Sequence, residues 1–223
     1  MCPWIKTAQR WTRRWPAAHL KGRHLDWAVT GAFGDNLHDT ARTLAKGLTI
    51  TAEDLSSLEE LGTYINYNGY GPAIEDLHFD PKELYLRLYA AQGPLDFVRN
   101  SPDFEKLSTG YREDMARAEA LQPLHANPTS AVFLLPEEAW ARRVSGVYSN
   151  DLATNNPTRA HAVLTLNAKG NYLISVRAPM TNKQGAAELC MQFPTGGGRA
   201  GAAGINDLPL DRLQDFVAAF ERA

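Results

Sequence analysis

The spacing of apolar residues predicts helices through the first half of the chain. The run WAVTGAF, residues 27–33, predicts a buried helix or strand that delivers an acidic residue, Asp35, at its end. Apolar residues at helical spacing then predict a helix over residues 36–46, with Gly47 placed to end it.

Capping signals continue this pattern. Thr51 opens a capping motif, and the helix that follows it is expected to stop at Gly62. The segment TYINYNGYGP, residues 63–72, has the composition of a loop. Pro81 then suits the first turn of another helix. Two more helices are predicted over residues 102–107 and 111–121, and QPLHANPTS, residues 122–130, has the prolines and polar residues of a linker.

The pattern changes after this linker. SAVFLLP and HAVLTLNAKGNYLISVRAP are apolar and β-branched, and the second predicts a hairpin that turns at residues 169–171. DLPLDRLQDFVAAFERA predicts an amphipathic closing helix. The fold class is therefore α/β, with a mostly helical first domain over 1–121 and a small mixed sheet with helices over 131–223.

Composition narrows the class of protein. The chain has 223 residues, 44% of them hydrophobic, and a formal net charge of −2, so no global field attracts nucleic acid or an anionic membrane. The only cysteines are Cys2 and Cys190, which fits a reducing compartment, and no apolar run is long enough to cross a bilayer. We expect a cytoplasmic protein without membrane partners. The basic, tryptophan-rich start is interpreted as a loosely packed end, the alternative being an arm for nucleic acid or a membrane surface.

The stretch FPTGGGRAGAAGIN is the strongest candidate for chemistry. Consecutive amides of Gly196, Gly197 and Gly198 could converge on an anion, and Arg199 could add a permanently charged, bidentate donor. A Walker loop is excluded, because no Lys-Ser/Thr pair follows the glycines. The alternative is a tight turn before a packed strand or helix.

Arg177 supports a phosphate site. It ends the apolar strand NYLISVR, where an arginine is costly to bury unless an anion meets it. Two arginines in one small domain, one of them beside the glycines, favour a phosphate pocket. The alternative is a surface residue at the end of a strand.

Other polar residues give weaker signals. Asp35 stands where α/β proteins place a catalytic or metal-binding carboxylate. Asn66 and Asn68 could contact a substrate, and Tyr67 and Tyr70 could stack on a base, although the same residues also make ordinary turns.

These motifs together resemble the DHH phosphoesterases, the superfamily of RecJ-like exonucleases and oligoribonucleases. SVRAP followed by FPTGGGRAGAAGIN resembles the glycine motif of their DHH-associated domain, and LDWAVTGAFGDN resembles a motif that ends in a metal-binding aspartate, here Asp35. LGTYINYNGYG stands where RecJ-like members have a loop containing glycine and asparagine. Residues 1–121 would then be a partial, mostly helical DHH-type domain, and 131–223 the DHH-associated, substrate-binding domain.

The resemblance implies metal-dependent phosphodiester hydrolysis. In a full-length form, two divalent ions, Mn or else Mg, would activate water and clamp the phosphate oxygens, with Asp35 as one ligand. Arg177, Gly196–Gly198 and Arg199 would hold a phosphate of a single-stranded nucleic acid, short oligonucleotide or nucleotide.

Two departures modify this expectation. Arg199 replaces the histidine of the family's glycine motif, which keeps positive charge but removes a proton donor. The family's first three motifs would precede residue 17, and only MCPWIKTAQRWTRRWP stands there. We therefore expect a truncated, split or degenerate phosphoesterase that is inactive alone and whose exposed apolar surface favours homo-oligomers or poor stability. The alternatives are a non-catalytic nucleic-acid or nucleotide-binding module, or an inert assembly domain.

Overall fold

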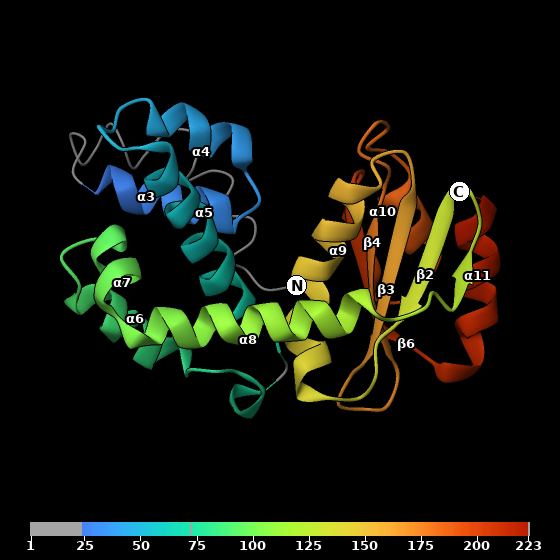
Figure 1. Cartoon of the computed structure of the whole chain (residues 1–223). Coiled ribbons are helices and arrows are strands. Elements are labelled where there is room, and N and C mark those ends of the chain that lie inside the picture. The colour runs from blue at the N-terminus through green and yellow to red at the C-terminus, as the bar shows by residue number, and fades with distance from the viewer. Residues whose placement is uncertain (1–23, 72, 223) are drawn as a thin grey trace. The chain divides into compact units, whose positions relative to one another are not determined.

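The computed structural model describes residues 24–71 and 73–222, which form two compact units (Figure 1). The first unit comprises the described residues up to Asn68 together with His78–Gly110. The second comprises Gly69–Leu77, apart from residue 72, and the chain from Tyr111 onward. The described helices are all too short or too polar to span a bilayer.

The first unit is helical. Its elements are α3 (Leu25–Gly34), α4 (His38–Ala45), α5 (Ala52–Tyr67), α6 (Pro81–Ala90), α7 (Pro94–Asn100) and the first part of α8 (Pro102–Glu119). Local signals start several of them: the Thr51 hydroxyl accepts a hydrogen bond from the amide of Asp54, and the Asp54 carboxylate accepts one from the amide of Thr51. Proline occupies the first turn of α6 and of α7.

Two helices continue past the points where the sequence predicted a break. The helix that begins after Thr51 does not stop at Gly62 but continues to Tyr67. A methyl group at Gly62 would lie 2.2 Å from the carbonyl oxygen of Thr30 in α3, so this glycine permits close helix packing instead. Likewise, the two helices predicted over 102–107 and 111–121 are the single helix α8, in which Gly110 makes room for the His78 ring.

The second unit is built on a six-stranded sheet of order β1-β2-β3-β4-β6-β5, which confirms the mixed α/β class. Its strands are β1 (His125–Ala126), β2 (Ser130–Leu134), β3 (Ala160–Leu166), β4 (Tyr172–Arg177), β5 (Gly196–Arg199) and β6 (Ala202–Leu208). β2 and β3 are parallel and are connected through α9 (Ala139–Asn155), whereas every other pair is antiparallel. The predicted β3–β4 hairpin is confirmed, with Gly170 at positive φ in its turn. Residues 122–130, expected as a linker, contain β1.

Helices cover the two faces of this sheet differently (Figure 1). On one face, α10 (Ala186–Cys190) and α11 (Leu213–Arg222) complete the main hydrophobic core, and the rings of Phe216 and Phe220 stack within it. On the other face, α9 packs on β3 and part of β4, and its Tyr148 packs edge-on against Phe133 of β2. The 3-10 turn η2 (Leu210–Arg212) leads into α11.

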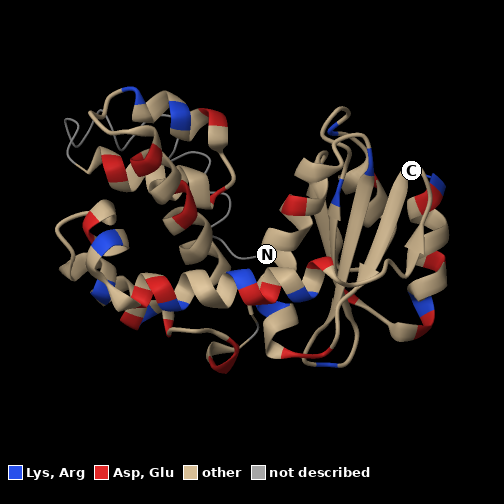
Figure 2. Cartoon of the chain, in the orientation of Figure 1, with Lys and Arg blue, Asp and Glu red and all other residues tan. Residues whose placement is uncertain are grey.

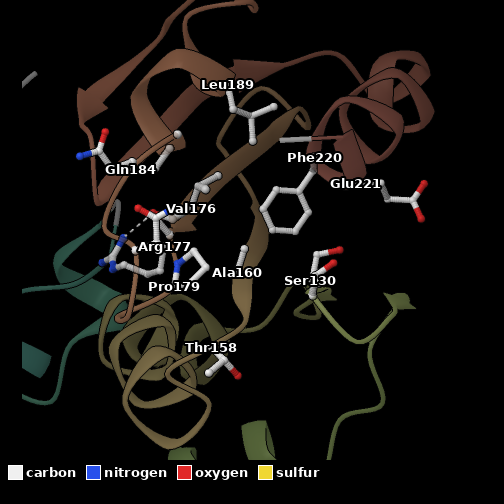
Figure 3. Close-up of a pocket in the computed structure, with 15 residues that line it drawn as sticks. Ser130, Thr158, Ala160, Val176, Arg177, Pro179, Gln184, Leu189, Phe220 and Glu221 are labelled. Atoms are coloured by element: carbon white, nitrogen blue, oxygen red, sulfur yellow. Dashed lines mark hydrogen bonds between the residues drawn. The ribbon is translucent and has the colours of Figure 1, made fainter.

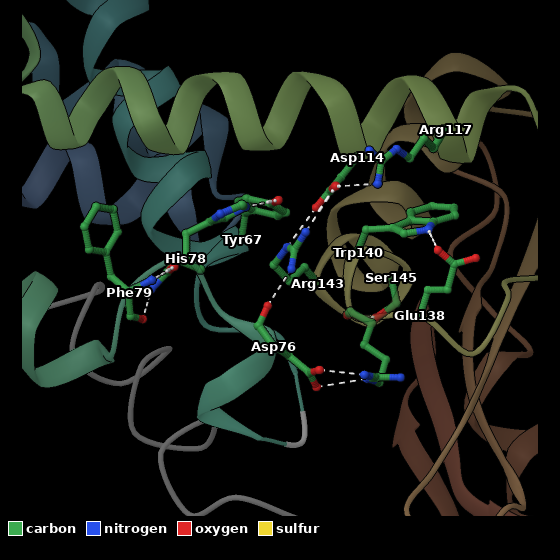
Figure 4. A network of polar contacts seen from close by, with 12 residues as sticks. Tyr67, Asp76, His78, Phe79, Asp114, Arg117, Glu138, Trp140, Arg143 and Ser145 are labelled. Carbon is green, nitrogen blue, oxygen red and sulfur yellow. Dashed lines mark hydrogen bonds and ion pairs between the residues drawn. The ribbon is translucent and has the colours of Figure 1, made fainter.

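Two arginines of α9 hold the loop Gly69–Leu77, which contains the 3-10 turn η1 (Ile74–Asp76) (Figure 4). Arg142 donates two hydrogen bonds to the carboxylate of Asp76, Nε at 2.9 Å and Nη2 at 2.6 Å. Arg143 donates to the Asp76 carbonyl oxygen and to both carboxylate oxygens of the buried Asp114 in α8. The hydrogen bonds from Arg142 are the main reason that the pKa of Asp76 is lowered. The loop is therefore fixed within the second unit.

Candidate phosphate-binding site

The two candidate arginines occupy one row across the sheet. Arg177 of β4 stands opposite Ala202 of β6, and Ala202 stands opposite Arg199 of β5. Residues directly opposite each other in antiparallel strands project from the same face, and neighbouring strands lie about 4.8 Å apart. Both arginines therefore project from one face with their Cα atoms about 10 Å apart, separated only by an alanine.

This face is open over half of the sheet. Along β4, Tyr172, Ile174 and Val176 are buried in the main core, while the alternate residues Leu173, Ser175 and Arg177 are exposed or half-buried. The corresponding residues of the neighbouring strand β3 are buried on the α9 side. α9 therefore covers β3 and part of β4, and it leaves the outer strands β6 and β5 accessible. Most of the sheet carries no charge (Figure 2), so the two arginines are distinctive there.

The three glycines of β5 have three different environments. A methyl group at Gly196 would lie 1.8 Å from the carbonyl oxygen of Cys190, so that glycine is required by the approach of α10. Gly198 has φ +151° and contacts Ala203, so it is required by the backbone. A methyl group at Gly197 would meet nothing within 4 Å. Folding does not require this glycine, and its absent side chain leaves space beside the two arginines.

The glycine run is not the anion loop expected from the sequence. Gly196–Arg199 forms an edge strand in a tight hairpin with β6, and β6 rather than a helix follows it. Successive N–H groups of an extended strand point to opposite sides, so they cannot converge on one anion. Any phosphate at this face must be held mainly by the arginine side chains, while the glycines provide space.

Arg177 is held in place by neutral groups only. Its Nε donates to Asn150 Oδ1 of α9 at 3.0 Å, and its Nη1 donates to Ser175 Oγ at 2.9 Å and to the Val176 carbonyl oxygen at 3.2 Å. Burial lowers the pKa of Arg177; Tyr70 opposes this shift, and the positive Arg199 adds to it. Among the described residues, neither arginine forms an ion pair with a carboxylate. A bound anion would therefore compensate charge that the protein leaves uncompensated.

The opposite face holds a different cavity (Figure 3). Its volume is about 200 Å³, and apolar side chains such as Val176, Leu189 and Phe220 line it. The hydroxyl of Ser130 is buried at this cavity and has no hydrogen-bond partner among the described groups. Of the described residues that line it, Arg177 alone is cationic, and its hydrogen bonds to Asn150 and Ser175 direct its guanidinium away from the cavity. The candidate site formed by Arg177 and Arg199 therefore lies on the α9 side, away from this cavity.

The two candidate asparagines belong to α5 and its end. Asn68 caps α5 and is buried; its Nδ2 donates to the Phe79 carbonyl oxygen at 2.9 Å, and its Oδ1 accepts from the Phe79 amide at 3.1 Å. This side chain anchors the chain at Phe79 and is not available to a substrate. Asn66 lies within the last turn of α5, one turn beyond the predicted helix end. Neither residue belongs to the unit that contains Arg177.

Asp35 caps the C-terminal end of α3 in the first unit. The backbone contact of Gly34 with Gly62 fixes that helix end, and partial desolvation raises the pKa of the Asp35 carboxyl. His38 does not join it in a ligand set, because His38 pairs with Glu59 at 3.0 Å. The described residues bring together no group of three or more His, Cys, Asp or Glu side chains that could hold a metal ion. They therefore do not fit a two-metal centre.

Sequence reasoning missed the contribution of α9. Asn150 orients Arg177, and Gly146 accommodates the ring of Tyr70: a methyl group at Gly146 would lie 2.1 Å from Tyr70 Cζ. A small residue in an otherwise helical segment was the available signal. Tyr67, the other candidate for stacking, is buried and shares a 2.8 Å hydrogen bond with His78 (Figure 4).

Comparisons with known proteins test the fold. No protein-family model matches the chain, and no curated protein matches it significantly in sequence. Among solved structures, it is similar to the pGpG-specific phosphodiesterase PggH from Vibrio cholerae, with a TM-score of 0.54 and 13% identity over 81% of this chain and 70% of that one. It is also similar to RecJ from Thermus thermophilus in complex with Mg²⁺, with a TM-score of 0.58 and 18% identity over 89% of this chain.

The chain has the fold of the DHH phosphoesterases. This confirms the resemblance read from the sequence at the level of fold. The chain spans 33% of the length of the RecJ chain that it matches. At these sequence identities a shared fold does not establish a shared activity, so the function has to be argued from the side chains of this protein.

Proposed function

We propose that this protein binds phosphates of a short oligonucleotide or single-stranded nucleic acid on the open half of its DHH-associated sheet. Arg177 would hold one phosphate, with Asn150 and Ser175 orienting its guanidinium. Arg199 would contact the same strand about 10 Å across the sheet. Gly197 would allow the ligand backbone to approach the sheet closely.

The observation that carries this proposal is a row of two arginines without carboxylate partners among the described residues, on a face that is otherwise open and lined by small residues. Arginine matches phosphate oxygens with paired N–H donors, and its charge persists at any physiological pH. The formal net charge of −2 provides no general attraction for nucleic acid, so binding would depend on this local pair.

The DHH fold supports a second function, metal-dependent phosphodiester hydrolysis. PggH is a phosphodiesterase by name, and the solved RecJ structure contains Mg²⁺. Asp35 is the residue here that would contribute to holding Mn²⁺ or Mg²⁺, and a bound ion would supply Lewis-acid chemistry. Because the described residues offer no complete ligand set, we rank hydrolysis second and assign this chain's own residues to gripping the substrate.

Binding is tested by fluorescence anisotropy with a fluorescein-labelled five-nucleotide single strand. We expect Arg177→Gln and Arg199→Ala each to weaken binding about tenfold or more, because each removes charged hydrogen bonds to phosphate. Arg212→Ala is the matched control, since Arg212 already pairs with Asp215. Unchanged affinity in both site variants would refute the proposal.

Hydrolysis is tested on the same oligonucleotide with Mn²⁺ or Mg²⁺ added, comparing the parent protein with Asp35→Asn. Cleavage that depends on the metal and on Asp35 would support the second function. Cleavage that survives the substitution would show that the metal is held by other residues. We also propose that the protein is cytoplasmic. We further propose that it forms homo-oligomers, which analytical ultracentrifugation would detect.

A further inference from the structure

A cavity of about 300 Å³ lies on the α9 side of the sheet. Its walls are formed by the loop segment Gly69–Gly71, by Arg142 and Ser145 of α9, and by the β3–β4 hairpin, which contributes Thr165, Leu166, Asn167 and Leu173. All of these residues belong to the second unit. The cavity is thus on the same face of β4 as Arg177, because Leu173 and Arg177 are an even number of residues apart on that strand and their side chains project to the same side.

Tyr70 connects this cavity with the arginine. Tyr70 lines the cavity, and its ring sits against Gly146, one turn of α9 before Asn150, which accepts a hydrogen bond from Arg177. The loop that carries Tyr70 is fixed by the paired hydrogen bonds from Arg142 to Asp76. The ring is therefore held at the border between the cavity and the phosphate site.

The distance between the two sites suits one nucleotide. Arg177 Nη1 lies 2.9 Å from Ser175 Oγ, so its guanidinium is beside Ser175. Leu173 is two residues further along the same strand, which at about 3.4 Å per residue places it about 7 Å away. A phosphate at the guanidinium and a base against Leu173 would be separated by little more than a sugar.

The chemistry of the walls suits a nucleobase. Leu173 is 41% exposed and Tyr70 is half-buried, so an apolar and an aromatic surface are available to the flat faces of a ring. The Ser145 hydroxyl donates to the Arg142 carbonyl oxygen at 3.0 Å and keeps its capacity to accept from a base edge. No carboxylate of the described residues lines the cavity, and the guanidinium of Arg142 is already paired with Asp76.

We infer that this cavity is a base-binding subsite for the nucleotide whose phosphate lies at Arg177, with Tyr70 and Leu173 as the contacting side chains. The inference rests on the proposed phosphate site and assigns a nucleotide, rather than any phosphorylated small molecule, as its ligand. In this inference Tyr70 and Leu173 select for a ligand with a base, and the arginines bind the charged phosphate.

The test compares adenosine 5′-monophosphate with ribose 5-phosphate, using ¹H–¹⁵N chemical-shift titration of the full chain to millimolar ligand. The parent protein should bind the nucleotide about tenfold more tightly, the gain expected from one stacked base. Tyr70→Ala and Leu173→Ala should each reduce this ratio without changing the affinity for ribose 5-phosphate. Tyr70→Phe should keep the ratio, and Leu210→Ala is the matched control because Leu210 is exposed outside the site.

The outcomes separate the two proposals. Equal affinity for the two ligands, with binding of both lost in Arg177→Gln, would overturn the base subsite and leave the phosphate site intact. Binding of neither ligand, or binding indifferent to Arg177, would overturn both. If Tyr70→Ala and Leu173→Ala leave the ratio of the affinities for adenosine 5′-monophosphate and ribose 5-phosphate unchanged, the base binds elsewhere and this cavity is not the base subsite.

Discussion

The salt dependence of oligonucleotide binding tests the arrangement of the two arginines most directly. Arg199 is exposed at the end of the edge strand β5, and no ion pair with it occurs within the described part of the chain. Arg199→Ala should therefore leave the fold intact and remove one phosphate contact. Arg177→Gln removes the other and can still accept or donate a hydrogen bond near Asn150.

The expected magnitude follows from the number of contacts. Each phosphate contact on a single strand contributes about −0.7 to the slope of log affinity against log salt concentration. Two contacts predict a slope of about −1.4, so that raising salt from about 50 to about 200 mM weakens binding about sevenfold. With Arg199→Ala the slope should fall to about −0.7 and the loss to about 2.6-fold.

The assay is anisotropy of the labelled five-nucleotide strand at several salt concentrations, for the parent protein, both single variants and Arg212→Ala. The double variant should show almost no salt dependence. A parent slope near zero, or a slope that does not change when Arg199 is removed, would refute the two-contact geometry. A slope much steeper than about −1.4 would show that other cations contribute.

Three further predictions concern the fold and the face of the sheet. Gly62→Ala should destabilise the protein by about 1–3 kcal/mol in chemical denaturation, because its methyl group would lie 2.2 Å from the Thr30 carbonyl oxygen. Gly31→Ala, where a methyl group meets nothing within 4 Å, should instead stabilise α3 by about 0.5–1 kcal/mol, and equal effects would contradict the packing argument. Burial lowers the pKa of His161 to about 4. The neutral His161 side chain therefore makes its full contribution to the free energy of unfolding when the pH is above about 6.5, the pKa of histidine in the unfolded chain. As the pH falls toward 4, the free energy of unfolding should decrease by about 3 kcal/mol. His161→Leu should remove this loss from unfolding curves measured at a series of pH values. Gly197→Ala should keep the melting temperature within a few degrees but weaken oligonucleotide binding in the anisotropy assay, whereas unaltered binding would mean that no ligand approaches this residue.

Local chemistry made much of the fold predictable. The capping motif at Thr51 and the proline at position 81 start helices through groups only a few residues apart, so their signals are complete in the sequence. The β3–β4 hairpin is similar, because alternation of apolar residues and a turn glycine specify it locally.

Glycine was the residue whose role the sequence could not decide. A glycine such as Gly62 commonly ends a helix, yet the role of this one depends on the backbone of α3, which lies some thirty residues away in the sequence. The run at 196–198 could equally suit an anion loop, and only the pairing of β5 with β6 makes it an edge strand. Long-range packing, rather than local preference, decided both cases.

The candidate site was only partly predictable for the same reason. Arg177 and Arg199 could be named from their residue type and context, but their common row depends on strand register across β6. Tyr70 and Asn150 depend on how α9 lies over the sheet. The surroundings of Asn68 were not predictable either, because its buried side chain forms two hydrogen bonds with the backbone of Phe79, eleven residues away.

The position of β5 at the border of the sheet has a consequence for solubility. A free strand edge presents unpaired backbone groups that can recruit another chain, and this one has almost no side chains to obstruct such pairing. Its brevity, the irregular backbone at Gly198 and the charge of Arg199 are the features that oppose such pairing. Replacing Arg199 by a neutral residue would therefore remove a barrier to aggregation together with a contact to phosphate.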